Sequence, residues 1–188
     1  NDSSSIALSC QTSHSTNMTR IRLATLSDAK NLAVLAERTF RDTSAEHTTP
    51  EDMATYCHQA YGEEKQSQEL ADPQCSILVA QWNDQLIAYA LLRWGRSPEC
   101  VSGIRAGELQ RLYLDKAWHG TGLAQELMDA CLAVFDSRKS GSVWLAVWEN
   151  NPRAIAFYKK FAFREVGNQI FPLGNDFQSD TIMERSDK

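Results

Sequence analysis

The sequence is poor in residues arranged to bind metal ions or to form a disulfide framework. Its five cysteines lie far apart without a CxxC pair, and its four histidines show neither metal-ligand spacing nor an HExxH motif. We therefore predict no metal site, no disulfide framework and a reducing, cytoplasmic compartment. The positions concerned are Cys10, Cys57, Cys75, Cys100 and Cys131, together with His14, His47, His58 and His119.

A basic excess and long apolar runs are also missing. The net charge is −5 and the isoelectric point is near 5.4, whereas nucleic acids and anionic membranes are bound by basic surfaces. No apolar stretch approaches the roughly 20 residues of a membrane-spanning helix. We therefore predict a soluble chain with no nucleic-acid or membrane partner. A cationic small molecule or a basic peptide suits an acidic protein better.

The composition predicts one folded domain. Of the 188 residues, 43% are apolar, which is enough for one substantial core. The first 17 residues are rich in Ser, Thr and Asn and lack the basic start and apolar centre of a signal peptide. We predict that residues 1–17 are a disordered or non-native extension. A single domain would then span residues 18–188, with a natural start at Met18.

Hydrophobic periodicity predicts the elements of that domain, because strands alternate and helices repeat every three to four residues. Ser27 and Thr49 are the expected N-caps of the first two helices, with Pro50 at the first helical position and an interruption at Gly62. The Asn-Asp pair in "WNDQ" predicts a hairpin. The expected strands are 18–24, two within 75–94, 108–114, 142–149, 164–171 and 179–185, and the expected helices are 27–40, 50–72, 122–138 and 151–163.

The order of these elements predicts a mixed α/β fold. The hairpin at the front favours antiparallel pairing, and the strand-helix-strand-helix unit behind it adds a parallel pair. We therefore expect a central mixed, mostly antiparallel sheet of about six or seven strands with helices on both faces.

The segment "WHGTGLAQELM" (118–128) places two glycines directly before a run of helix formers. A helix beginning near Gly122 directs unpaired N–H groups and the positive end of its dipole toward the loop, and missing side chains let a pyrophosphate approach. A Walker loop needs a lysine after the glycines, and the dinucleotide fingerprint needs a glycine where Gln125 stands. Neither nucleotide motif fits. A tight strand-to-helix turn without a ligand is the alternative.

Following the strand "ELQRLYLD", the loop "HGTGLA" resembles the acetyl-CoA signature Gln/Arg-x-x-Gly-x-Gly/Ala of the GNAT superfamily of N-acetyltransferases. His119 departs from its first position. Farther along, "NNPRAIAFYKKFAF" resembles the family pattern Asn-x-x-Ala-x-x-Phe/Leu-Tyr-x-x-x-Gly-Phe, with Ala162 in place of glycine. The resemblance covers roughly residues 18–185 and implies an acyl-CoA N-acyltransferase fold. The matching residues are Gly122, Ala124, Asn151, Ala154, Phe157, Tyr158 and Phe163.

The resemblance implies acetyl-CoA as co-substrate and direct attack by a primary amine in a ternary complex. It implies that Tyr158 protonates the departing thiolate, and Glu108 is the expected base, because an alkylammonium of pKa about 10.4 must first lose a proton. A core tyrosine and a solvated edge glutamate are the alternatives. A Leu112 or Tyr113 amide would stabilise the oxyanion. The residues expected to hold acetyl-CoA are Leu112, Tyr113, Leu114, His119, Gly120, Thr121, Gly122, Leu123, Ala124, Gln125, Asn151 and Tyr158.

The acceptor is indicated by less specific features. Between Asp42 and Asp72, eight acidic residues stand against one lysine, which favours a polyamine, another cationic amine, or a basic peptide; a pair of solvated helices is the alternative. The segments "LYLDKAWHGTGLAQELM" and "TPEDMATY" are similar to bacterial spermidine/spermine N-acetyltransferases. A non-catalytic acetyl-CoA-binding sensor module and a protein N-terminal or lysine acetyltransferase remain open as alternatives. A homodimer would fit the family's habit.

Overall fold

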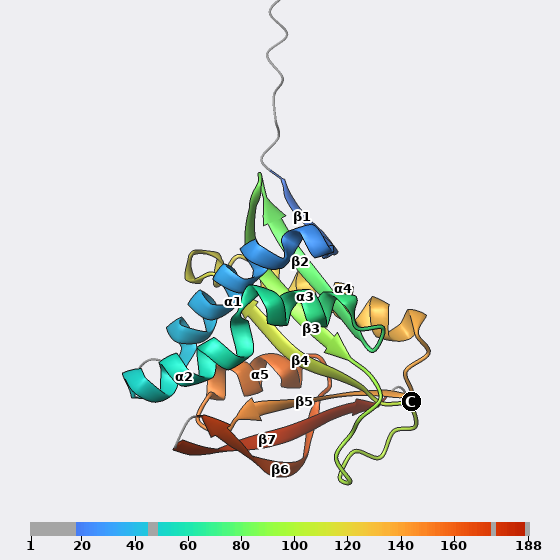
Figure 1. Cartoon of the computed structure of the whole chain (residues 1–188). Helices are drawn as coiled ribbons and strands as arrows, with labels where there is room; N and C mark the ends of the chain where they lie inside the picture. The colour runs from blue at the N-terminus through green and yellow to red at the C-terminus, as the bar shows by residue number, and fades with distance from the viewer. Residues whose placement is uncertain (1–17, 45–48, 174–175, 187–188) are drawn as a thin grey trace, which may run out of the picture.

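The computed structural model describes residues 18–44, 49–173 and 176–186, so the extension predicted for residues 1–17 lies outside the described residues. One seven-stranded sheet runs in the order β1-β2-β3-β4-β5-β7-β6 (Figure 1). Neighbouring strands are antiparallel except for β4 and β5, which confirms the predicted mixed, mostly antiparallel sheet. The strands are β1 (Thr19–Leu23), β2 (Cys75–Trp82), β3 (Gln85–Arg93), β4 (Gly107–Leu114), β5 (Ser142–Trp148), β6 (Arg164–Leu173) and β7 (Asp176–Ser186).

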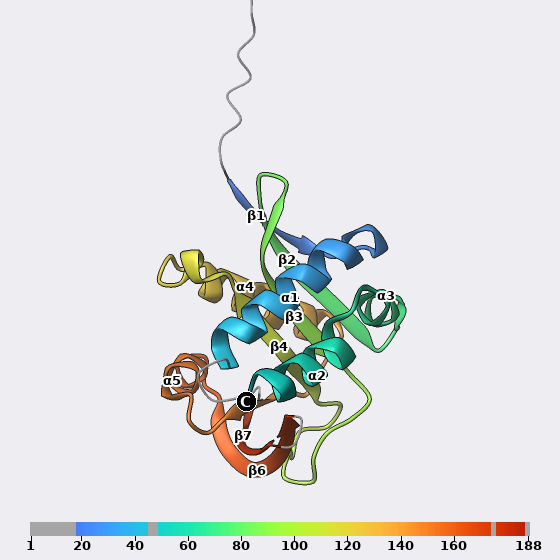
Figure 2. The same ribbon diagram turned by 60° about the vertical axis from the view of Figure 1, so that its left-hand side comes forward.

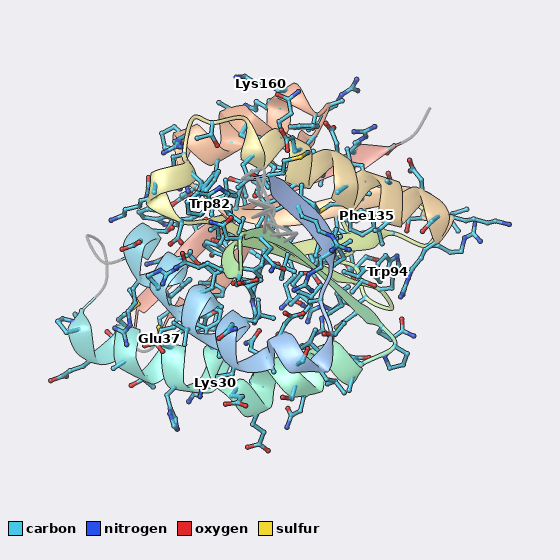
Figure 3. All side chains as sticks on the ribbon, turned by 90° about the horizontal axis from the view of Figure 1, so that it is seen from above. Lys30, Glu37, Trp82, Trp94, Phe135 and Lys160 are labelled. Atoms are coloured by element: carbon cyan, nitrogen blue, oxygen red, sulfur yellow. The ribbon has the colours of Figure 1, made fainter. Side chains whose placement is uncertain are left out.

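Helices cover both faces of the sheet, as predicted. Buried side chains of α1 and α2 pack on one face, against Val79 and Tyr89, and those of α4 pack on the other, against Ala90 and Leu145. Figure 3 shows the sheet between Lys30 and Glu37 of α1 on one side and Phe135 of α4 and Lys160 of α5 on the other. The helices are α1 (Ala29–Ser44), α2 (Pro50–Tyr61), α3 (Glu63–Ala71), α4 (Leu123–Ser137) and α5 (Pro152–Lys160).

The helix starts show where local sequence signals are reliable. The Thr49 hydroxyl caps α2 by accepting from the Asp52 amide, Pro50 stands in the first turn, and Gly62 separates α2 from α3, all as predicted. The expected Ser27 cap is wrong. Thr25 is the N-cap, and a 3-10 turn over Leu26–Asp28 precedes α1, because the Asp28 carboxylate accepts from the Thr25 amide.

The two C-terminal strands are longer than predicted. Pairing between β6 and β7 continues to Leu173 and Asp176, through residues that were expected to form the turn. Pro172 is tolerated there because β6 is the edge strand of the sheet, where a missing N–H need not remove a ladder hydrogen bond.

Candidate functional site

The parallel strands β4 and β5 separate soon after they begin. Their pairing consists of Gly107 with Val143 and Glu108 with Trp144. Figure 1 shows the two strands close together at one end and far apart at the other. From Leu109 to Leu114, the β4 edge that faces β5 therefore has no strand partner, and its main-chain groups can bind an extended ligand in the split.

Main-chain polarity shows which β4 amides face the split. The Asp115 amide donates to the Ile87 carbonyl of β3 at 2.8 Å. Tyr113 lies two residues before Asp115 in the same β3–β4 register, so its main-chain groups also point toward β3. In an antiparallel pair, alternate residues point their N–H and C=O groups to opposite edges. Leu112 and Leu114 therefore point theirs toward β5. Of the two amides considered for the oxyanion, the Leu112 amide has this direction.

A bulge in β4 changes which face of the sheet its side chains point to. The β3–β4 register skips Gln110, so Glu108 and Arg111 point to the same face of the sheet instead of opposite faces. That face is the one covered by α1, α2 and α3, since Tyr113 packs in their cluster and Leu112 in that of α4. Simple alternation, as read from the sequence, would have placed Glu108 with Leu112.

The glycine loop, residues 115–122 between β4 and α4, lies at the open end of the split. Gly120 and Gly122 have positive φ angles of 78° and 90°, and a Cβ at either position would meet no atom within 4 Å. Within the described ranges, the amides of Gly120, Thr121, Gly122 and Ala124 have no hydrogen-bond acceptor. Helix α4 begins here without a side-chain cap. Four free N–H groups and the helix dipole therefore form a site suited to an anion.

A histidine and an arginine join the glycine loop to α5. The His119 Nε2 lies 3.3 Å from the Leu114 carbonyl, and its Nδ1 lies 3.4 Å from Arg153 Nη1. Because a guanidinium can only donate, Nδ1 accepts and Nε2–H donates to Leu114. Figure 2 shows α5 and the loop before α4 on the same side of the molecule.

Arg153 was not predicted as a site residue. It has no carboxylate partner among the described residues, and it lies in the first turn of α5, where the helix dipole disfavours a cation. That position was the available signal: a basic residue in a first helical turn is unfavourable unless it serves another contact. Here the contact places a positive charge beside the free amides of the loop.

Asn151 and Tyr158 come from α5, as expected from the second motif. The Asn151 Oδ1 caps the helix by accepting from the Ala154 amide at 3.1 Å, so its NH₂ group is the part that could reach a ligand. The Tyr158 ring packs on Phe157 and Phe163, with centroid distances of 5.5 and 5.9 Å. Burial raises the pKa of Tyr158 above its ordinary value, so its hydroxyl keeps its proton at neutral pH.

Glu108 lies at the closed end of the split. It is 6% exposed, and its two carboxylate oxygens accept from Arg96 at 2.8 and 3.3 Å. The alternative of a solvated edge glutamate is therefore wrong. Each oxygen accepts one hydrogen bond from Arg96 and keeps a further acceptor site, so the role of Glu108 as base stays a prediction.

Part of the acid-rich segment forms ion pairs with the rest of the protein. Three of its carboxylates are held within the protein, since Asp42 pairs with Lys116, Glu69 with Arg111, and Asp72 with Arg93. These pairs attach α1 and α3 to the sheet and to the start of the glycine loop. These three carboxylates are therefore engaged in ion pairs within the protein.

The split sheet with an anion site at its open end defines the class of acyl-CoA-dependent N-acyltransferases. The sequence matches the model of the acetyltransferase (GNAT) family over residues 37–163, and the chain belongs to this family. Among the described residues, no helix is long and apolar enough to cross a membrane, and no three His, Cys, Asp or Glu side chains lie together as metal ligands would.

Known proteins agree on this class. The chain is 34% identical over 160 residues to an uncharacterized N-acetyltransferase of Mycobacterium tuberculosis, which covers 85% of this chain and 98% of the relative. The crystal structure of the PaiA N-acetyltransferase from Thermoplasma acidophilum in complex with coenzyme A matches with a TM-score of 0.72 at 21% identity, over 90% of this chain and 99% of that one. A spermine/spermidine N(1)-acetyltransferase of Bacillus subtilis is 26% identical over 105 residues, which are 54% of this chain and 64% of the relative. The chain is an N-acetyltransferase.

Proposed function

We propose that the protein transfers an acetyl group from acetyl-CoA to a primary amine by direct attack in a ternary complex, and that the acceptor is a cationic amine such as a polyamine. The observation that carries the proposal is the set of free amides of Gly120, Thr121, Gly122 and Ala124 at the open end of the β4–β5 split. The Thermoplasma structure with bound coenzyme A supports the co-substrate, and the Bacillus subtilis relative supports the acceptor class.

The loop and the split would hold different parts of acetyl-CoA. The diphosphate would accept hydrogen bonds from the loop amides, with Arg153 supplying an opposite charge nearby. The pantetheine arm would lie along the free edge of β4, bonded to main-chain groups of Leu112 and Leu114 as an added strand would be. The Asn151 NH₂ group would donate from the α5 side of the split.

The reaction needs proton transfer but no covalent enzyme intermediate, because the thioester is already activated. After the ammonium loses a proton, its nitrogen attacks the carbonyl carbon, and the Leu112 N–H stabilises the oxyanion. The C–S bond then breaks, and the Tyr158 hydroxyl gives its proton to the thiolate. The nitrogen loses two protons in all: one is balanced by the new thiol, through Tyr158, and the other is released to solvent.

Binding and turnover test the proposal separately. Acetyl-CoA at about 100 times its Kd should stabilise the fold by about 2.7 kcal/mol, which raises Tm by roughly 5–10 °C for a domain of this size. Thiol release should follow with polyamines or other cationic amines. A shift without thiol release for any acceptor would indicate a sensor module, and release with basic peptides alone would indicate a protein acetyltransferase. Absence of a shift at saturation would refute the proposal.

Substitution of Tyr158 tests the acid. Tyr158→Phe should lower kcat by about 100-fold, the usual size of a general-acid contribution, with the Kd for acetyl-CoA unchanged. Tyr89→Phe is the matched control, because the Tyr89 hydroxyl is buried without a hydrogen-bond partner among the described residues. Equal kcat values for the two variants would show that Tyr158 is not the general acid.

A further inference from the structure

Aromatic side chains from four elements meet on the α1–α3 face of the sheet, and we call them the aromatic wall. Phe40 of α1 lies 4.7 Å from Tyr56 of α2 and 6.3 Å from Tyr113 of β4, and Tyr56 lies 5.5 Å from Phe171 of β6. Phe40 is buried, and the residues Tyr56, Tyr113 and Phe171 are partly buried. Because Tyr113 follows Leu112 on β4, the aromatic wall adjoins the split where the acetyl group would lie.

Asp180 of β7 shares this face. It pairs with Gln169 of β6 and with Trp148 of β5, and directly opposite residues point to one side of a sheet. Phe171, two residues beyond Gln169, points the same way. Asp180 and the aromatic wall therefore lie on one face of the sheet, with Tyr113 on the β4 side of the split and with Asp180 and Phe171 on the β5 side.

The environment of Asp180 differs from that of the other buried acids. Of the five buried carboxylates among the described residues, three are paired with arginines: Asp28, Glu69 and Glu108. Glu184 accepts hydrogen bonds from two loop amides. Asp180 is 8% exposed and has neither a cation nor an amide cluster among the described residues.

The groups that face Asp180 do not neutralise it. Among the described residues, the Gln169 side chain is its hydrogen-bond partner and the charged group that acts on it is another acid, Glu149, which directly follows β5. Burial, together with Glu149, raises the pKa of Asp180 to about 6. The ionised carboxylate is therefore buried without a compensating charge among the described residues, which is unfavourable unless a ligand supplies the cation.

We infer that Asp180 binds the ammonium group of the acceptor and that the carbon chain of the acceptor lies on the aromatic wall. The inference rests on the proposed function and narrows its substrate class. Aromatic faces attract both alkyl chains and ammonium ions, and the carboxylate fixes the charged end. The acceptor is thus a primary alkylammonium with an apolar chain and no neighbouring carboxylate, because Asp180 and Glu149 would repel an α-amino acid.

A pair of acceptors that differ by one carboxylate tests the inference. Phenethylamine is phenylalanine without its carboxylate, so wild-type kcat/KM should be at least about tenfold higher for phenethylamine. In Asp180→Asn, kcat/KM for phenethylamine should fall about tenfold or more, mainly through KM, and the preference over phenylalanine should shrink. The Kd for acetyl-CoA should not change. Phe171→Leu should raise KM for phenethylamine in the same way.

The control is Glu165→Gln, an exposed β6 carboxylate that pairs with Lys159 and should leave all these values unchanged. Stability separates binding from a structural role: Asp180→Asn removes an uncompensated buried charge, so its Tm should be equal to or above that of the wild type. A lower Tm with unchanged kcat/KM, or an unchanged preference between the two acceptors, would overturn the inference. If acetyl-CoA fails to bind, or no amine is acetylated, the proposed function itself fails.

Discussion

At the scale of single residues, Ala162 shows why a motif position normally holds glycine. Its φ is +64°, in the left-handed region, and it follows Phe161, the C-cap of α5. The Phe163 amide donates to the Tyr158 carbonyl at 3.3 Å and the Ala162 amide to the Lys159 carbonyl at 3.1 Å, which is the Schellman pattern of a helix end. A side chain in this conformation costs about 1–2 kcal/mol, so the chain retains strain next to Tyr158.

Replacing this residue should relieve the strain. Ala162→Gly should raise the free energy of unfolding by about 1 kcal/mol, because the strain removed exceeds the extra backbone entropy of glycine in the unfolded chain. Urea denaturation midpoints measure the change. Ala156→Gly, at an exposed position inside α5, should instead lower the free energy of unfolding by about 1 kcal/mol. Equal destabilisation by the two variants would contradict this account of Ala162.

Single residues differ in how far the sequence predicts them. Gly122, Asn151 and Tyr158 stand at fixed positions in local motifs, so their places at the loop and on α5 could be predicted. Arg153 had a local signal in its first-turn position on α5, but Asp180 had none, because what distinguishes Asp180 is a missing partner. That property depends on which strands and helices pack together, and no local pattern contains it.

At the scale of elements, the junction between β1 and α1 depends on one ion pair. Arg22 donates two hydrogen bonds of 2.8 Å to the Asp28 carboxylate, which also accepts from the Thr25 amide. The hydrogen bond from Arg22 is the main cause that lowers the pKa of Asp28 to about 2. The folded state therefore favours the charged carboxylate, and Asp28 stabilises the fold wherever it is ionised.

The stability contributed by Asp28 should depend on pH. A fall of the pKa from 3.8 to about 2 corresponds to about 2 kcal/mol, which Asp28→Asn should lose at pH 7. The contribution is complete above the unfolded pKa and disappears as pH falls through the folded one, so the two proteins should converge between about pH 4 and pH 2. Unfolding in urea at several pH values measures this. Asp84→Asn, in the exposed β2–β3 turn, should show no such dependence, and a constant difference across pH would exclude the ion pair as its cause.

Helices and strands were predictable where the hydrophobic periodicity is regular and a turn or capping residue marks the end of the element. The β2–β3 hairpin and the start of α2 follow from alternation, an Asn-Asp turn and a Thr-Pro cap. The bulge at Gln110 was not predictable, because "ELQRLYLD" alternates regularly and the extra residue is visible only in its pairing with β3. The Thr25 cap was missed for a related reason: it depends on Asp28, which Arg22 holds in place.

At the scale of the whole molecule, two ion pairs join α1 to the start of the glycine loop. Arg38 of α1 donates to the Asp115 carboxylate at 2.9 and 2.7 Å. In the second pair α1 supplies the acid instead: the Lys116 Nζ lies 3.3 Å from the Asp42 Oδ1. Helix α1 carries Phe40 of the aromatic wall between these positions. The helix that carries part of the aromatic wall is thus attached to the start of the glycine loop. The order of elements in the sequence predicted the parallel pair within a mostly antiparallel sheet. It could not predict these ion pairs, because they join residues that are far apart in the chain.

A double-mutant cycle measures this attachment. Half-exposed ion pairs contribute about 0.5–1 kcal/mol, so Arg38→Gln or Asp115→Asn should each raise the Kd for acetyl-CoA about two- to fivefold, by letting the loop move from its position. The double variant should show no further rise, because both substitutions break the same contact. Arg41→Gln breaks a pair with Glu37 that stays within α1, and it should leave the Kd unchanged. Additive effects of Arg38→Gln and Asp115→Asn, or an equal effect of Arg41→Gln, would show that α1 does not position the loop through this contact.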